Sequence, residues 1–172
     1  MQRVMIIGQP GSGKSTLAKE LGARTGLPVH HIDRIHWTPG WIERDRQDKI
    51  QMARDVQAQD EWIFEGGLSV TWSERLERAD ALIWLDVPFL VRCWRVLKRR
   101  MQYHGQTRPD LPENCPEKID LEFAMWIWNT RNTASLKMHK LYEDAPPTKT
   151  KLRLCDLRQV ESFLRGVSAR AA

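Results

Sequence analysis

The residues with the clearest chemical potential form one glycine-rich segment near the start of the chain. The segment fits the pattern G-x-x-x-x-G-K-[ST] without a mismatch and has the sequence Gly8-Gln9-Pro10-Gly11-Ser12-Gly13-Lys14-Ser15. Such glycines let backbone N–H groups turn inward around phosphate oxygens, and Lys14 adds a full positive charge on a flexible side chain. The hydroxyl of Ser15 is suited to bind Mg²⁺. The pattern therefore predicts a site for a nucleoside triphosphate and Mg²⁺.

The residues on either side of this segment have the form that phosphate binding requires. An apolar run at 3–7 predicts a strand before the segment, and a helix is expected from Lys14 to Thr25, ending at Gly26. The N-terminus of that helix would add its partial positive charge to the site. A glycine-rich turn that binds nothing is the alternative. We expect ATP to contact Gly8, Pro10, Gly11, Ser12, Gly13, Lys14, Ser15 and Thr16.

Strand-like and helix-like segments alternate along the chain, which is typical of an α/β fold with a mainly parallel sheet. We predict a three-layer P-loop NTPase fold in which helices flank a five-stranded, mainly parallel sheet. The remaining strands are expected at 28–32, 62–64, 81–85 and 151–154, and the remaining helices at 45–60, 90–103, 121–142 and 156–164. A chain of 172 residues has the size of one domain, so we expect a single domain over 1–172.

The helix expected at 90–103 has one apolar and one basic side. The apolar side carries Leu90, Trp94, Leu97 and Met101, and the opposite side carries Arg92, Arg95 and Arg99. We predict that the apolar side is buried and that Trp94, like Trp84, lies at a core position. The next segment is broken by Gly105 and three prolines, so we expect a small lid over 102–120.

Further motifs cover most of the chain in a fixed order. They are GQPGSGKSTLAKELG, GLPVHHIDRIHW, WIFEGG, RLERADALIWLDVP, WRVLKRR, TRPD, CPEKIDLEF and WIWNTR. In this order they resemble the adenylate-kinase-like P-loop kinases, and more closely the DNA topology modulation proteins (FlaR-like). The resemblance implies an ATP-dependent phosphotransferase, although the name of the closer group describes a cellular effect rather than a reaction.

The resemblance also implies roles for charged residues. Arg95 and Arg99 have the spacing of the paired arginines that hold the transferring phosphoryl group together with Lys14, and Arg100, Arg108 and Arg131 are the expected lid arginines. A solvated basic surface is the alternative for each arginine. Glu65 is at a position similar to that of the acid that orients the water shell of Mg²⁺, so Ser15 and Glu65 are the expected metal residues. Asp86 is the competing acid, and a capping role is its alternative.

The acceptor of the phosphoryl group is expected to bind at 33–60. Asp33, at the end of the second expected strand, resembles the acid that contacts the acceptor hydroxyl in shikimate- and gluconate-type kinases, and a capping carboxylate is the alternative. The histidines nearby lack a ligand spacing, so zinc is not favoured. Stacking on a base and contact with an anionic metabolite both remain open. The expected acceptor-binding residues are Asp33, Arg34, Trp37, Trp41 and Gly66.

Two classes of function follow from these observations. The favoured one is a Mg-dependent kinase that transfers the γ-phosphoryl group of ATP to a nucleotide, a nucleoside or a small hydroxyl acceptor. The alternative is an ATP-dependent regulator of DNA topology, because the net charge is +5 and six basic residues, with no acid among them, fall within 92–108. A protein that binds nucleotide without turnover is a weaker third. We expect a cytoplasmic monomer without a membrane partner; its three cysteines show no CxxC pair.

Overall fold

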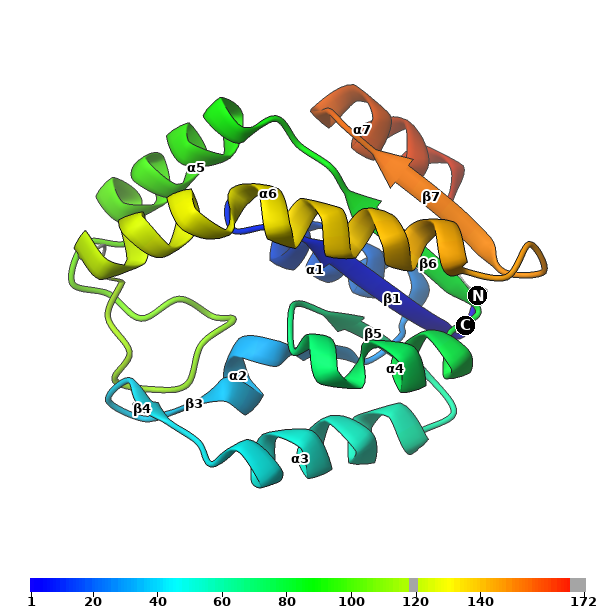
Figure 1. The fold of residues 1–172 in the computed structure, drawn as a ribbon, viewed down its shortest axis with the longest axis horizontal. Helices are drawn as coiled ribbons and strands as arrows, with labels where there is room; N and C mark the ends of the chain where they lie inside the picture. Colours follow the sequence, from blue (N-terminus) through cyan, green and yellow to red (C-terminus); the bar gives the residue numbers. More distant parts are fainter. Residues whose placement is uncertain (118–120, 168–172) are drawn as a thin grey trace.

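A parallel sheet forms the centre of the protein in the computed structural model, which describes residues 1–117 and 121–167 (Figure 1). The prediction of a five-stranded, mainly parallel sheet in an α/β fold is confirmed, since every strand pairing in this sheet is parallel. The three central strands, β5, β1 and β6, are mainly apolar because both faces of the sheet are covered there. Their order across the sheet is β2 (Val29–His31), β5 (Trp62–Glu65), β1 (Arg3–Gly8), β6 (Ala81–Leu85) and β7 (Thr150–Leu154).

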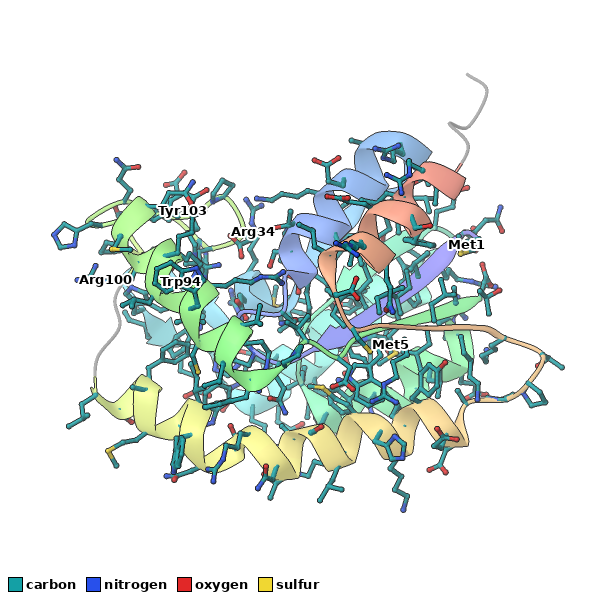
Figure 2. The ribbon with its side chains drawn as sticks, turned by 90° about the horizontal axis from the view of Figure 1, so that it is seen from above. Met1, Met5, Arg34, Trp94, Arg100 and Tyr103 are labelled. Atoms are coloured by element: carbon teal, nitrogen blue, oxygen red, sulfur yellow. The ribbon has the colours of Figure 1, made fainter. Side chains whose placement is uncertain are left out.

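Helices cover both faces of the sheet and complete three layers, as predicted (Figure 1). Successive side chains of β1 point to opposite faces, so Met5 and Ile7 enter one core and Ile6 enters the other. Figure 2 labels Met5 within the molecule. One face carries α1 (Lys14–Thr25) and α7 (Leu157–Gly166). The other carries α2 (Ile32–His36), α3 (Arg46–Ala58), α4 (Trp72–Arg78) and α6 (Leu121–Asp144).

The orientation of α5 (Phe89–Gln102) is the opposite of the predicted one. Trp94 is 60% exposed, and the rest of its apolar stripe is exposed as well, whereas Arg92 is only 5% exposed. The buried stripe and the core position of Trp94 were therefore wrong predictions, while Trp84 does lie in the core. The physical reason is that Arg92 and Arg95 donate to backbone carbonyls of neighbouring segments, which draws the basic side inward.

The segment after β2 differs from the expected one. The strand ends at His31, and Asp33 lies in the first turn of α2 rather than at a strand end. A two-stranded antiparallel hairpin follows, made of β3 (Trp37–Thr38) and β4 (Ile42–Glu43). The short 3₁₀ helix η1 (Ser69–Thr71) and helix α4 were also not predicted. These elements are too short to show a hydrophobic period, so a sequence pattern does not reveal them.

The segment between α5 and α6 is irregular. We call its described residues 103–117 the lid loop. Isolated β-bridges join His104 to Glu117 and Thr107 to Pro116 within it. Residues 118–120 of the predicted lid and 168–172 of the predicted domain lie outside the described part of the chain. Among the helices that are described, none is long and apolar enough to cross a membrane.

Candidate active site

The glycine-rich segment joins β1 to α1 at the carboxyl end of the sheet. Strands β5 and β6 flank β1 on opposite sides, so the chain connections diverge at the end of β1. The crevice formed at such a point is the usual ligand position of open α/β sheets. Gly11 has φ +77°, and a Cβ on it would lie 2.4 Å from the carbonyl oxygen of Arg92. Gly13 precedes α1 with φ +98°. Both positions therefore need glycine, one of them because α5 packs directly on the loop.

Three helices contribute polar groups around this loop, α1 and α5 with side chains and α6 with a backbone carbonyl. Lys14 Nζ donates to the carbonyl of Gln9 at 3.3 Å, and Arg95 Nη1 donates to the carbonyl of Ser12 at 3.1 Å. Helix α6 contributes the carbonyl of Arg131, which accepts from the side chain of Gln9 at 2.7 Å. The Arg131 guanidinium itself lies 3.8 Å from the ring centre of Trp128. Lys14 and Arg95 are thus at the loop, whereas the charge of Arg131 stacks on its own helix.

A buried carboxylate connects the loop to two other strands. Glu65, at the end of β5, accepts from the hydroxyl of Ser15 at 3.0 Å and contacts Nδ1 of His31, at the end of β2, at 2.7 Å. Both Glu65 and His31 are more than nine-tenths buried. Oxygen donors of this kind fit Mg²⁺. Asp86 instead binds Arg153, whose Nε lies 2.9 Å from its carboxylate.

The predicted acceptor-contacting acid, Asp33, lies in the same cluster of charges. Burial raises the pKa of Asp33 and so does Glu65, while Lys14 and Arg108 oppose the increase. Asp110 of the lid loop joins the cluster, and Ser15 lowers the pKa of its carboxyl group. Burial alone would raise the pKa of Asp110, but Arg108 beside it brings the pKa below its usual value. The structure therefore gathers carboxylates around Ser15 and Lys14 from three separate segments.

Around Ser15 and Glu65, sequence reasoning missed three residues. The spacing of His31 from other residues does not match a known motif. The one sequence signal for Asp110 is that it lies two residues after Arg108. Arg75 is fully buried behind β5, where its guanidinium lies 3.9 Å from the ring centre of Phe64 and donates to the carbonyl of Gly66 at 3.2 Å. Burial lowers the pKa of Arg75 to about 9. It supports the turn that follows Glu65.

Two of the predicted acceptor residues, Arg34 and Trp41, contact the lid loop directly. Arg34 Nη2 donates to the carbonyl of Pro109 at 2.7 Å, and Figure 2 shows Arg34 beside that loop. The indole Nε1 of Trp41 donates to the carbonyl of Pro116 at 3.0 Å, and the rings of Trp37 and Trp41 meet edge to face with centres 5.3 Å apart. Gly66 has φ +111° and packs against Ile32 of α2. The acceptor segment and the lid loop therefore form one connected surface.

The remaining predicted arginines also contact the lid loop. Arg99 and Arg108 both bind the carboxylate of Glu117, and Arg100 donates to the backbone carbonyl of the same residue. Figure 2 shows Arg100 beside the lid loop on α5. These three arginines are thus brought together, but Arg95 and Arg131 are held elsewhere. Glu117 was not singled out by the sequence.

Solved structures of known proteins share this fold. The structure of shikimate kinase from Acinetobacter baumannii in complex with shikimate is similar, with a TM-score of 0.55 and 14% identity over 96% of this chain and 89% of that chain. Deoxyadenosine kinase from M. mycoides with bound dCTP is similar, with a TM-score of 0.52 and 16% identity over 94% of this chain and 96% of that chain. The chain therefore has a P-loop kinase fold.

The sequence itself identifies the family. A family model described as an AAA domain matches residues 4–120, which is more than half of the chain. The protein belongs to this AAA-domain family. A comparison with curated proteins gave no match. The matched residues include the glycine-rich loop, Glu65, and the lid loop with Asp110.

Proposed function

We propose that this protein is a kinase that transfers the γ-phosphoryl group of Mg-ATP to a hydroxyl group of a small acceptor. The observation that carries the proposal is the contact between Ser15 and Glu65 at 3.0 Å, with Asp33 in the same charged cluster. A phosphate loop, a pair of oxygen donors for Mg²⁺ and a carboxylate for the acceptor are the components that phosphoryl transfer needs. The finer resemblance to the DNA topology modulation proteins is compatible with this reaction.

The residues present fit Mg²⁺ because a hydroxyl and a carboxylate oxygen meet beside the phosphate loop. Ser15 would hold the ion, and Glu65 would orient its water shell while His31 fixes the carboxylate. When bound, Mg²⁺ neutralises charge on the phosphate oxygens. Lys14 and Arg95 would hold the phosphates by charge-assisted hydrogen bonds. The ion pair of Asp86 with Arg153 favours Glu65 as the acid that serves the metal.

Asp33 supports a hydroxyl acceptor rather than a phosphate acceptor. A general base works best when its pKa lies near the working pH, and burial raises the pKa of Asp33 in that direction. A phosphate acceptor would need cations, but Arg34 and Arg44 donate to the backbone carbonyls of Pro109 and Ile35. Asp33 would accept the proton of the acceptor hydroxyl. The oxygen of that hydroxyl would attack the γ-phosphorus of ATP in line with the leaving ADP.

The placement of the basic residues within 92–108 argues against the nucleic-acid alternative. Arg92, Arg95 and Arg99 donate to groups inside the molecule, and so do Arg100 and Arg108. An exposed basic surface is what backbone binding to DNA requires. Absence of DNA retardation at low salt would agree with this conclusion, and retardation that ATP abolishes would favour the alternative.

Release of ADP tests the proposal directly. Purified protein is incubated with Mg-ATP and a panel of sugars, hydroxy acids, nucleosides and nucleotides. We expect release that depends on one hydroxyl-bearing acceptor, is lost in Asp33→Asn and falls by roughly 100-fold in Glu65→Gln. Asp86→Asn is the matched control and should keep its Mg²⁺ dependence. Binding of ATP without acceptor-dependent release across the panel would contradict the proposal.

A further inference from the structure

One buried glutamate of the lid loop is the meeting point of three arginines. Glu117 is 2% exposed. Its Oε1 accepts a hydrogen bond of 3.0 Å from Nε of Arg99 and lies 2.9 Å from Nη2 of the same arginine. Its Oε2 lies 2.5 Å from Nε of Arg108, and its backbone carbonyl accepts from Arg100. The backbone N–H of Glu117 donates to the carbonyl of Gln106 at 2.9 Å. Both the side chain and the backbone of this residue are therefore engaged.

The two side-chain partners come from different elements. Arg99 lies in the last turn of α5, and Arg108 lies in the lid loop. Burial lowers the pKa of Arg99 and the nearby charge of Arg108 lowers it further, whereas Glu117 raises it. The two guanidinium groups would therefore repel one another if no carboxylate lay between them. Asp110 accepts from Arg108 at 2.6 Å and supplies the second negative charge.

Each guanidinium keeps a donor for a ligand. Arg99 donates from Nε to Glu117 and keeps Nη2 at ion-pair distance, while Arg108 donates from Nη1 to Asp110 and forms an ion pair with Glu117 through Nε, without hydrogen-bond geometry. Among residues 1–117 and 121–167, Nη1 of Arg99 and Nη2 of Arg108 have no hydrogen-bond partner. A guanidinium has five N–H donors in a fixed plane, so anchoring one edge also sets the direction of the other edge. Glu117 thus orients the guanidinium of Arg99 and, together with Asp110, that of Arg108, and each guanidinium keeps one terminal nitrogen unused.

We propose that Glu117 is a positioning residue that holds Arg99 and Arg108 together, so that the two arginines contact the γ-phosphate of bound ATP as a unit. This inference rests on the proposed function for the identity of the anion. The sequence alternative, a solvated basic surface, does not explain a carboxylate that is almost fully buried between two arginines. Removal of the carboxylate charge should weaken contact with the γ-phosphate more than contact with the β-phosphate.

The test compares two nucleotides that differ in the terminal phosphate. Affinities for Mg-ADP and for a non-hydrolysable ATP analogue are measured by calorimetry in the wild type, Glu117→Gln, Glu117→Asp and Glu74→Gln. Glu74 is the matched control, because it binds Arg54 with both carboxylate oxygens at an exposed site. In Glu117→Gln we expect the analogue to lose roughly 10-fold in affinity and phosphoryl transfer to lose about 100-fold, with ADP affinity nearly unchanged. Glu117→Asp keeps the charge and should recover part of the loss.

The outcomes separate this inference from the proposed function. If no acceptor supports turnover but Glu117→Gln lowers the affinity for the ATP analogue and not that for ADP, the positioning role stands and the kinase proposal fails. If turnover occurs and Glu117→Gln matches Glu74→Gln in every measurement, the positioning role is overturned. Equal losses for ADP and for the analogue in both Glu117 variants, with lower melting temperatures, would also overturn it in favour of a structural contact.

Discussion

The phosphate loop and the lid loop both surround the candidate site, but they are built in different ways. The phosphate loop is the eight consecutive residues 8–15, from the end of β1 into the first turn of α1, and its shape comes from backbone geometry at Gly11 and Gly13. The lid loop depends on side chains that are distant in sequence, such as Arg34 with Pro109 and Trp41 with Pro116. A local motif therefore specifies one half of the site, and long-range contacts assemble the other.

Replacing the lysine of the phosphate loop gives the largest expected effect. Lys14→Met should lower phosphoryl transfer by roughly 100- to 1000-fold, because one charged donor to the phosphates is lost. Stability should hardly change, since the Lys14 ammonium makes one hydrogen bond of 3.3 Å to a carbonyl. ADP release and thermal melting measure the two quantities. A loss below 10-fold would show that the lid arginines dominate phosphate binding.

Alanine at Gly11 tests whether the loop depends on its contact with α5. Gly11 and Gly26 have similar positive φ angles, +77° and +73°, but only at Gly11 would a Cβ meet neighbouring atoms. Gly26→Ala should cost about 1–2 kcal/mol from backbone strain alone. Gly11→Ala should cost roughly 1–3 kcal/mol more, because Arg92 and Val96 are in the way. Equal losses of unfolding free energy in the two variants, measured by urea unfolding, would mean that α5 shifts at little cost to accommodate the added methyl group.

Asp33→Asn tests the charged cluster between the two loops. Burial raises the pKa of Asp33 above its usual value of 3.8, so folding disfavours its ionised form. The variant should therefore be more stable than the wild type at neutral pH, by roughly 0.5–2 kcal/mol, although it is inactive. The difference should disappear as the pH falls below 3.8, where the carboxyl is protonated in both states.

Urea unfolding between pH 3 and pH 8 measures this pH dependence. The control is Asp60→Asn, an exposed carboxylate after α3. The control should show no such gain. A wild type that is more stable than Asp33→Asn at pH 7 would mean that Lys14 and Arg108 outweigh burial.

The smallest expected effect belongs to the outer side of α5. Trp94→Ala should change the free energy of unfolding by less than about 0.5 kcal/mol, because Trp94 is 60% exposed. Trp84→Ala is the buried counterpart and should cost roughly 3–5 kcal/mol. Chemical denaturation compares the two variants. A large loss at Trp94 would restore the orientation that the sequence predicted for this helix.

The extent to which sequence predicts this molecule differs between regions. The central sheet and α1 follow from apolar runs and from the loop motif. The two sides of α5 were separated correctly, but which side faces inward was wrong. Periodicity shows that two faces differ, and only the carbonyls that accept from Arg92 and Arg95 draw the basic face inward. Glu117 had no signal, because its partners lie in other segments.

The sequence by itself determined the α/β class, the central strands and the phosphate loop with Lys14 and Ser15. Their causes are local, since burial of apolar runs and the φ freedom of glycine act within a few residues. The tertiary structure alone decided that Glu65 rather than Asp86 meets Ser15, that Asp33 lies in a helix and that Glu117 joins two arginines. Buried charges select partners by position in space, which spacing along the chain does not encode.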